Sequence, residues 1–325
     1  MQNFEYANPT TLKDAAAMLS ADSAVLAGGT DLISSMKDYL ASPKRVVNIK
    51  GIKELGGISK TATGLRIGAT VTLDEIAGNA LVKAEYPSLS AAAIGISSPQ
   101  IRNMGTAGGD LCQRPKCWYF RQGYGLLGVD QSGKALVPNG ENRYHAIFGG
   151  GPAYFVSPSS FGPALLALGA KVKLFSAQYG ARVIGIEEFF VTPKNNITRE
   201  TAVMPNELLT EILIPSAKGA KNATYEIRQK EALDWPLATA SVVLTMKGTT
   251  VQSAAIVMGH VAPTPWRSAA AESAIAGKSI TAASAEAAGA AAVADAKPLS
   301  QNGYKVQLAK VAVKRALLAA AGVKG

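Results

Sequence analysis

Two short glycine-rich segments limit most strongly what this chain can fold into. AVLAGGTDLI occupies residues 24–33, where an apolar run leads into two glycines and then a helical pattern, and NMGTAGGDL occupies residues 103–111. Glycine permits a positive φ and lets the backbone approach a ligand closely. A helix start adds unpaired N–H groups and roughly half a positive charge. The first segment therefore suits a pyrophosphate, although for an isolated GGT a plain strand-to-helix turn is the more common explanation.

A second glycine-rich segment makes the ligand-binding interpretation more specific. Two such loops can hold a diphosphate from both sides, with Thr30 as a hydroxyl donor and Asp110 available to a ribose or ribityl hydroxyl. Two unrelated tight turns remain the alternative at this point.

The hydrophobic pattern predicts alternating strands and helices before residue 216 and a different organisation after it. Thr11 with Asp14, and Thr72 with Glu75, have the spacing of helix caps. The predicted strands are Phe4–Ala7, Ala24–Ala27, Arg45–Asn48, Leu65–Ala69, Lys171–Phe175, Thr224–Lys230, Ser241–Lys247 and Val251–Val257. The predicted helices are Leu12–Leu19, Leu32–Leu40, one after Thr72, Ser88–Ile94, Phe161–Leu168, a pair within Ala269–Ala296, and Tyr304–Ala321.

Three further features organise the chain. We predict a turn at Gly105–Asp110 and a loop without periodicity at Gln122–Gly151. Loops longer than about 12–15 residues are usually functional or mobile. The small, polar and charged stretch Ser216–Asn222 predicts a domain boundary.

The composition limits the chemistry that the side chains can do alone. The net charge is +10, but the basic residues are scattered and not interleaved with aromatic ones, which argues against a nucleic-acid surface. Two cysteines, Cys112 and Cys117, and two histidines, His145 and His260, are too few for a disulfide framework or a recognisable zinc site. The chemistry is therefore expected from a bound cofactor or on a partner.

Ordered motifs extend along nearly the whole chain. AGGTDL and TAGGDL are followed by QRPKCWYFR, SPSS, ELLTEILIP and RQKEALDWPLATASV. In this order they resemble the FAD-binding medium subunits of molybdenum hydroxylases, a family that includes xanthine dehydrogenases, aldehyde oxidoreductases and aerobic carbon-monoxide dehydrogenase. The QRPKCWYFR segment is most similar to the periplasmic aldehyde oxidoreductase branch.

The resemblance implies an α+β fold of the vanillyl-alcohol-oxidase type (PCMH type). Two subdomains, at about 1–55 and 56–217, would form the FAD-binding domain. A C-terminal domain, 218–325, would add a three-stranded sheet with helices and cover the flavin.

The resemblance also implies which residues contact FAD. Leu208 and Leu209 would lie against the adenine, and Arg228 and Lys230 would fall on a strand near the isoalloxazine, where a cation would stabilise reduced flavin. A solvated strand face is the alternative for these two cations. The first phosphate loop would comprise Leu26, Ala27, Gly28, Gly29, Thr30, Asp31, Leu32 and Ile33, and the second Thr106, Ala107, Gly108, Gly109 and Asp110.

Two positions depart from the family pattern. Ser160 stands where family members commonly carry an acidic residue, and it is that acidic residue that is expected to contact the ribityl chain. Glu226 or Ile227 stands where a lysine is frequent. Flavin affinity and redox tuning are therefore expected to differ here.

The implied function is electron transfer within a larger oxidoreductase. A large molybdenum-cofactor subunit would oxidise the substrate, and a small [2Fe–2S] subunit would pass electrons to a non-covalent FAD, which would reduce an external acceptor. A self-contained flavin oxidase or reductase of the same fold, and a flavin-free scaffold, are the alternatives.

Some relatives hold a [4Fe–4S] cluster on four cysteines in the region after QRPKCWYFR. This chain keeps Cys117 and has no later cysteine, so we expect no such cluster.

The expected compartment is the cytoplasm. The segment MQNFEYANPTTLKD has no secretory pattern, and no apolar run approaches about 18 residues, so we expect no membrane insertion. Export together with a signal-bearing partner subunit is the alternative.

Overall fold

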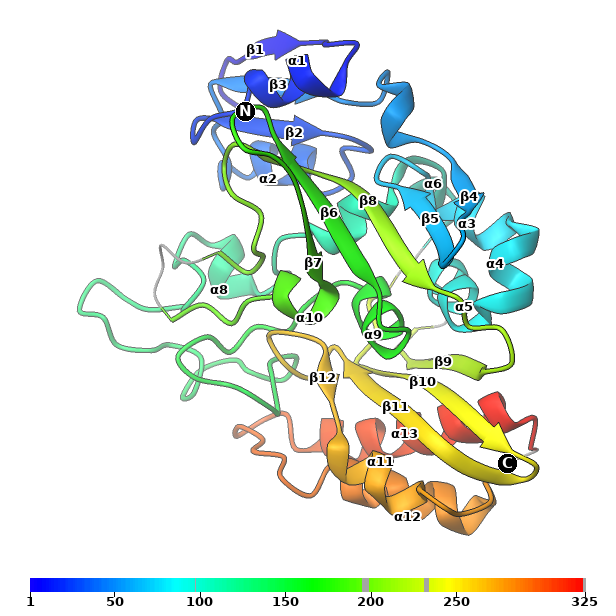
Figure 1. Ribbon diagram of the computed structural model, residues 1–325. Helices are drawn as coiled ribbons and strands as arrows, with labels where there is room; N and C mark the ends of the chain where they lie inside the picture. Colours follow the sequence, from blue (N-terminus) through cyan, green and yellow to red (C-terminus); the bar gives the residue numbers. More distant parts are fainter. Residues whose placement is uncertain (97, 195–198, 231–233, 324–325) are drawn as a thin grey trace.

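The computed structural model describes residues 1–325 except 97, 195–198, 231–233 and 324–325 (Figure 1). Three of the residues in the RQKEALDWPLATASV motif, 231–233, thus lie outside the described part. Within the described residues the strands form three sheets, one in each of three successive parts of the chain. Figure 1 shows these parts stacked from the N-terminal sheet at the top to the C-terminal helices at the bottom.

The N-terminal part is a small parallel sheet with helical crossovers. Its strands are β1 (Glu5–Ala7), β2 (Ser23–Leu26) and β3 (Arg45–Asn48), in the order β1-β3-β2. Parallel neighbours need a crossover connection, which α1 (Leu12–Ala17) and α2 (Leu32–Lys37) provide. The predicted cap is confirmed, because the Thr11 hydroxyl accepts the Asp14 N–H at 3.1 Å. The 3₁₀ helix η1 (Lys53–Leu55) leads out of this part.

The middle part is an antiparallel sheet that combines distant segments. Its strand order is β4-β5-β8-β6-β7, so β5, which ends at Gly68, pairs directly with β8, which begins at Glu207. Leu65, Ile67, Ile212 and Ile214 contribute to one buried cluster with the covering helices. The strands are β4 (Ile58–Lys60), β5 (Gly64–Gly68), β6 (Lys171–Ser176), β7 (Gly180–Gly185) and β8 (Glu207–Pro215). The helices are α3 (Leu73–Gly78), α4 (Ala80–Glu85), α5 (Pro87–Gly95), α6 (Pro99–Met104), α7 (Ala107–Leu111), α8 (Trp118–Arg121), α9 (Phe161–Ala167) and α10 (Ile186–Phe189).

The predicted turn at Gly105–Asp110 is wrong, because the chain forms the short helix α7 from Ala107 onward. Thr106 caps it by accepting the Gly109 N–H at 3.1 Å. The Gly108 N–H donates to the Ala69 carbonyl at 2.9 Å, which anchors the helix on the end of β5. These long-range contacts outweigh the poor helix propensity of two glycines.

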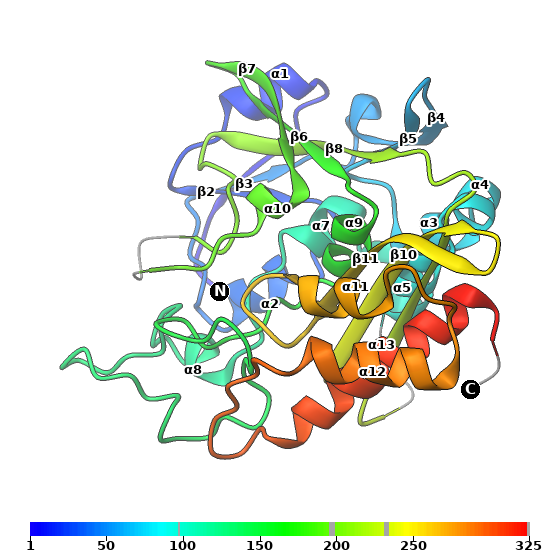
Figure 2. The ribbon, with the colours of Figure 1, turned by 60° about the horizontal axis from the view of Figure 1, so that its bottom comes forward.

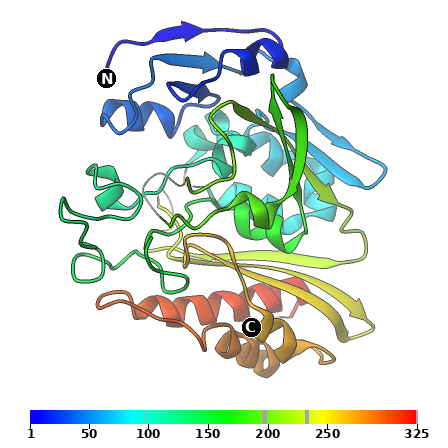
Figure 3. The ribbon, with the colours of Figure 1, turned by 60° about the vertical axis from the view of Figure 1, so that its left-hand side comes forward.

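The C-terminal part is an antiparallel sheet between two layers of helices. The strands are β9 (Lys221–Ile227), β10 (Ala238–Lys247), β11 (Thr250–Gly259) and the two-residue β12 (Trp266–Arg267), in the order β12-β11-β10-β9. The helices α11 (Ala269–Ile275), α12 (Ala282–Ala292) and α13 (Tyr304–Ala321) cover one face, while α5 and α9 contact the other (Figure 3). The three long strands agree with the implied sheet, and β12 adds a short fourth.

One predicted strand ends earlier than expected. β9 stops at Ile227, so Arg228 and Lys230 lie beyond it, and the predicted strand to Lys230 is wrong at that end. Register explains the end, because Ile227 pairs with Ala238, the first residue of β10, and the ladder has no further partner.

The segment Gln122–Gly151 has no helix or strand among its described residues, as predicted. Figure 2 shows it projecting from the body beside α8. None of the described helices combines the length and the apolar character needed to cross a membrane.

Candidate functional site

The two glycine-rich loops meet across one cavity. The cavity has a volume of about 490 Å³ and lies between the N-terminal sheet and β8. A smaller cavity of about 120 Å³ begins where the first ends. Both are lined by Thr30, Asp31, Thr106 and Gly109, so the loops form the wall that the two cavities share. A long ligand that passes between these residues would touch both loops.

The first loop turns sharply at its second glycine. Gly29 has φ +75°, a conformation that L side chains rarely adopt, and its Cα faces the side chains of Leu26 and Ile33. These two predicted site residues therefore support the loop from beneath. A Cβ on Gly28 would overlap the Met104 carbonyl, so this glycine lets the first loop touch the chain just before the second. Six of the eight predicted residues of this loop line the larger cavity: Ala27, Gly28, Gly29, Thr30, Asp31 and Leu32.

The second loop presents one open glycine to both cavities. Ala107 is fully buried, and a Cβ on Gly108 would lie 3.0 Å from Ala69, so these residues fix α7 to its support. A Cβ on Gly109 would come within 3.0 Å of the Thr106 hydroxyl alone and would otherwise project into the cavities. Gly109 is thus the position where backbone and ligand can approach most closely.

Asp110 lies at the wall of the smaller cavity but is held by the protein. Its carboxylate accepts hydrogen bonds from the Ser159 hydroxyl, from the Phe161 N–H at 3.1 Å and from Gln113 Nε2 at 2.9 Å. Burial raises the pKa of Asp110 to about 6, against these donors. The carboxylate therefore joins α7 to the start of α9, and only its remaining lone pairs are available to a sugar hydroxyl.

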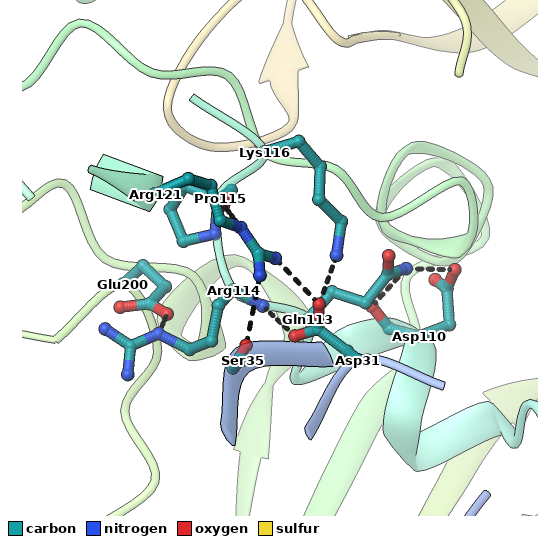
Figure 4. Close-up of polar contacts among 9 residues, drawn as sticks. All are labelled: Asp31, Ser35, Asp110, Gln113, Arg114, Pro115, Lys116, Arg121 and Glu200. Atoms are coloured by element: carbon teal, nitrogen blue, oxygen red, sulfur yellow. Dashed lines mark hydrogen bonds and ion pairs between the residues drawn. The ribbon is translucent and has the colours of Figure 1, made fainter. Parts of the chain in front are cut away.

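The segment Gln113–Arg121 crosses over the first loop and binds Asp31, and we call it the strap (Figure 4). Lys116 and Arg121 both pair with the Asp31 carboxylate, the latter at 2.9 Å, and the Arg114 N–H donates to it at 2.9 Å. Although burial alone would raise it, Lys116, the Arg114 N–H and Arg121 hold the pKa of Asp31 below its ordinary value. The strap thus connects the end of the second loop to Asp31 in the first.

The remaining predicted site residues fall into two groups. Leu208 and Leu209 on β8 line the larger cavity, and Ser160 lines the smaller one. Arg228 and Lys230 instead line a groove on the far side of β9, and Arg228 pairs with Glu226. The structure therefore does not bring these two cations to the cavities that the glycines line.

Several residues of the site have no local sequence signal. Arg114 pairs with the buried Glu200 and lines the larger cavity with it. Lys116 lies 5.6 Å from the ring centre of Trp235, and both line the smaller cavity. The QRPKCWYFR motif indicates this region, but it does not show what its cations bind. Their partner Asp31 lies 83 residues before Arg114 in the sequence, and only the fold brings the two together.

A third cavity adjoins the smaller one at Lys116. It has a volume of about 260 Å³ and shares Lys116, Pro158, Asp234, Trp235 and Pro236 with the smaller one. Aromatic side chains from the strap and the long loop, such as Trp118 and Tyr144, complete its wall. Cys117 and His145 also line it, with 3.1 Å between Sγ and Nε2.

The described residues fit an extended dinucleotide better than a metal. Nowhere in the described part do three His, Cys, Asp or Glu side chains gather as metal ligands would. The open face of Gly109 and the hydroxyl of Thr30, both on the wall of the larger cavity, suit a diphosphate. The apolar Leu208 and Leu209 at one end suit a base.

Comparison with known proteins agrees with this geometry. The family described as "FAD binding domain in molybdopterin dehydrogenase" matches residues 2–217, and the "CO dehydrogenase flavoprotein C-terminal domain" matches residues 223–320. The chain is 30% identical to the aldehyde oxidoreductase FAD-binding subunit PaoB of Escherichia coli, over 95% of this chain and 96% of that protein. It is also 30% identical to the carbon monoxide dehydrogenase medium chain of Hydrogenophaga pseudoflava, over 98% and 96%.

Solved structures show the same similarity. A chain of carbon monoxide dehydrogenase from Hydrogenophaga pseudoflava superposes with a TM-score of 0.76 at 30% identity, covering 98% of this chain and 97% of that one. A chain of the Cu,Mo-CO dehydrogenase superposes with a TM-score of 0.77 at 28% identity, covering 98% of each. Sequence and fold agree from end to end, and the chain therefore belongs to the molybdenum hydroxylase family as an FAD-binding medium subunit.

Proposed function

We propose that this chain carries electrons, through one non-covalent FAD, from the iron–sulfur clusters of a partner subunit to an external acceptor. The observation that supports this most is the continuous wall made by Thr30, Asp31, Thr106 and Gly109 between two cavities. When bound, FAD would supply the redox chemistry, because it accepts and releases electrons that no side chain here can store.

The chain's own residues bind and orient the cofactor. Gly28–Thr30 and Thr106–Gly109 would hold the diphosphate, and Leu208 and Leu209 would pack against the adenine. Ser160 and Trp235 would bound the space for the flavin ring. In this assignment residues 1–217 bind the cofactor and 218–325 cover it.

The names of the relatives support an assignment of partners. Those proteins are named as medium chains or FAD-binding subunits of dehydrogenases and oxidoreductases. We assign to this chain a large molybdenum-cofactor subunit and a small [2Fe–2S] subunit as partners. It would work in the cytoplasm or leave it together with a signal-bearing partner.

The strap region would serve as a structural connection without its own cluster. Cys117 faces His145, and Cys112 lines the larger cavity, so the two thiols belong to different cavities. Two cysteines in the whole chain cannot provide the four thiolates of a [4Fe–4S] cluster.

The test is to purify the chain and measure its visible spectrum, released cofactor and iron. We expect flavin bands, yellow cofactor released into the supernatant by acid precipitation, and no iron. A colourless folded chain contradicts the flavoprotein assignment, and flavin retained on the precipitate contradicts non-covalent binding. Close to four iron atoms per chain, the content of one [4Fe–4S] cluster, contradicts its absence.

A second measurement tests the electron-transfer role. Expressed with its neighbouring genes' products, the chain should co-purify with two further subunits, and its flavin should be reduced only when substrate is added to the complex. Rapid reduction of the isolated chain by a substrate would instead identify a self-contained oxidoreductase.

A further inference from the structure

Glu226 lies between the smaller cavity and the protein surface. It is the penultimate residue of β9, the edge strand of the C-terminal sheet. Its neighbours Tyr225 and Ile227 pack on the face of the sheet that α13 covers. Side chains alternate along a strand, so Glu226 faces α5 on the other side. A Cβ on Gly95 would meet both the Glu226 carboxylate and the Arg228 guanidinium. Because Gly95 and Ser160 line the smaller cavity, one layer of atoms separates Glu226 from it.

Few groups compensate this carboxylate. Its side chain is 7% exposed, one oxygen pairs with Arg228, and Oε1 has no hydrogen-bond partner among the described residues. Burial raises the pKa of Glu226 to about 7, opposed by Arg228 and the Ser160 hydroxyl and reinforced by the charge of Asp110.

The wider surroundings add further polar and charged groups. Thr239 pairs with Glu226 across β10, and its hydroxyl lies 2.9 Å from His260 Nδ1. Besides burial, the charges of Lys305 and Arg228 lower the pKa of His260. The charge of Lys116 opposes the effect of burial on the pKa of Asp110. The consecutive serines Ser159 and Ser160 each serve one carboxyl, of Asp110 and Glu226 respectively.

Glu226 also borders an open groove. Together with Arg228, Gln229, Lys230 and Arg315 it lines an open groove of about 470 Å³ between β9 and α13. Arg228 pairs with the Glu226 carboxylate and also lines this groove, so solvent lies on the other side of the ion pair.

We propose that Glu226 takes up one proton from solvent when negative charge builds in the neighbouring cavity and returns it when that charge leaves. This rests on the proposed function, which places the flavin ring in that cavity. Two electrons from the partner, taken up with one proton, leave the cavity one unit more negative than before. One carboxylate plus one proton from water then gives one neutral carboxylic acid, and no bond of the cofactor is involved. Glu226 would thus touch neither substrate nor cofactor, and would change the midpoint potential of the bound flavin through its own charge.

The test is the midpoint potential of the bound flavin between pH 6 and pH 9, in wild type and Glu226→Gln. Above about pH 7 the wild-type carboxyl is ionised before reduction, so we expect one extra proton per two electrons. For a two-electron couple this steepens the slope by about 30 mV per pH unit. E226Q should coincide with wild type at pH 6, lack the extra slope and be more positive at pH 9.

The matched control is Glu272→Gln, which removes a carboxylate that pairs with Arg267 in the same domain and is 16% exposed. It should follow the wild-type curve. Glu226→Asp keeps a carboxyl and should keep the extra slope, displaced along the pH axis.

An infrared difference spectrum at pH 8 gives a second readout, which does not depend on a midpoint potential. Reduction should produce a protonated-carboxyl band in wild type, shifted in E226D. Identical slopes in wild type and E226Q, or a missing band, overturn the role of Glu226 while leaving the flavin subunit intact. A wild-type chain that binds no flavin overturns the proposed function itself and this inference with it.

Discussion

Individual glycines in the two loops have different physical roles. Gly29 is required for its positive φ, Gly28 for contact with the Met104 carbonyl, and Gly108 for packing on Ala69. Gly109 has ordinary helical surroundings and an open Cβ direction, so its requirement is space for a ligand rather than backbone freedom. Replacing these residues should therefore separate folding from cofactor binding.

Gly109→Val should remove flavin from a protein that remains folded. A branched side chain there fills the shared wall of the two cavities, while α7 can accommodate it near Thr106. Gly28→Ala should instead lower the free energy of unfolding of the cofactor-free protein by about 1–3 kcal/mol, because backbone must move. Flavin content and urea unfolding measure the two effects.

The control for Gly109→Val is Gly78→Val, at an open position at the end of α3. It should keep its flavin. Full flavin content in G109V would show that the ligand approaches the chain elsewhere.

At the scale of elements, the strap connects the two loops mainly through ion pairs and hydrogen bonds of its side chains and backbone. It contributes the four-residue α8 and otherwise irregular chain, yet its cations neutralise Asp31 and Glu200. The Asp31 side chain is 19% exposed, so these ion pairs are shielded from water more than an ordinary surface pair.

Asp31→Asn should destabilise the cofactor-free protein at pH 7 by about 1–3 kcal/mol, since hydrogen bonds to a charged group are lost. The pKa of Asp31 is lowered in the folded state, so its contribution is present above the ordinary pKa of an aspartate and disappears as pH falls through the folded value. Wild type and D31N should therefore converge at low pH in urea unfolding.

Asp22→Asn is the matched control, because Asp22 pairs with Lys44 at a site where both side chains are mostly exposed. It should change stability by less than about 1 kcal/mol. An Asp31→Asn protein as stable as wild type at pH 7 would mean that the strap does not depend on this carboxylate.

At the scale of the whole molecule, the long loop joins the FAD-binding part to the C-terminal domain. Lys305, at the second position of α13, is 1% exposed and donates to the carbonyls of Tyr144, His145 and His260 at 3.2, 3.2 and 2.6 Å. Asn302 adds hydrogen bonds to the His145 and Ala146 carbonyls. The wall of the third cavity is thus held by a helix more than 150 residues away.

Lys305→Met should destabilise the protein by about 1–3 kcal/mol, because it leaves buried carbonyls without donors. Burial lowers the pKa of Lys305 to about 7. The unfolded chain therefore binds more protons than the folded one between pH 7 and about 10.4, and wild-type stability gains about 1.4 kcal/mol per pH unit there. K305M lacks this gain, so its deficit should grow from pH 7 to pH 9.

Lys310→Met serves as the control on the same helix, where Lys310 pairs with Glu286 and is 27% exposed. Its effect on stability should be small. A constant difference between wild type and K305M would show that Lys305 stays protonated in the fold.

Local signals determined much of the chain's organisation before any tertiary contact is considered. The capping pair at Thr72 and Glu75 forms a capping box, the helix Tyr304–Ala321 has the predicted bounds, and the turn after Lys247 joins β10 and β11. Ordered motifs identified the family and the two loops. Such features depend on hydrogen bonds and side chains within about four residues, which a sequence displays directly.

Tertiary structure alone decided how the site is assembled. It made a helix of the predicted turn at Gly105–Asp110, ended β9 before Arg228, and directed that arginine to Glu226 rather than to the cavities. It also buried Glu226, which raises the pKa of this carboxyl, and placed it near Asp110, 116 positions away in the sequence, whose charge raises that pKa further. Burial and charge proximity of this kind depend on which segments the sheets bring together, and no local pattern of residues records that pairing.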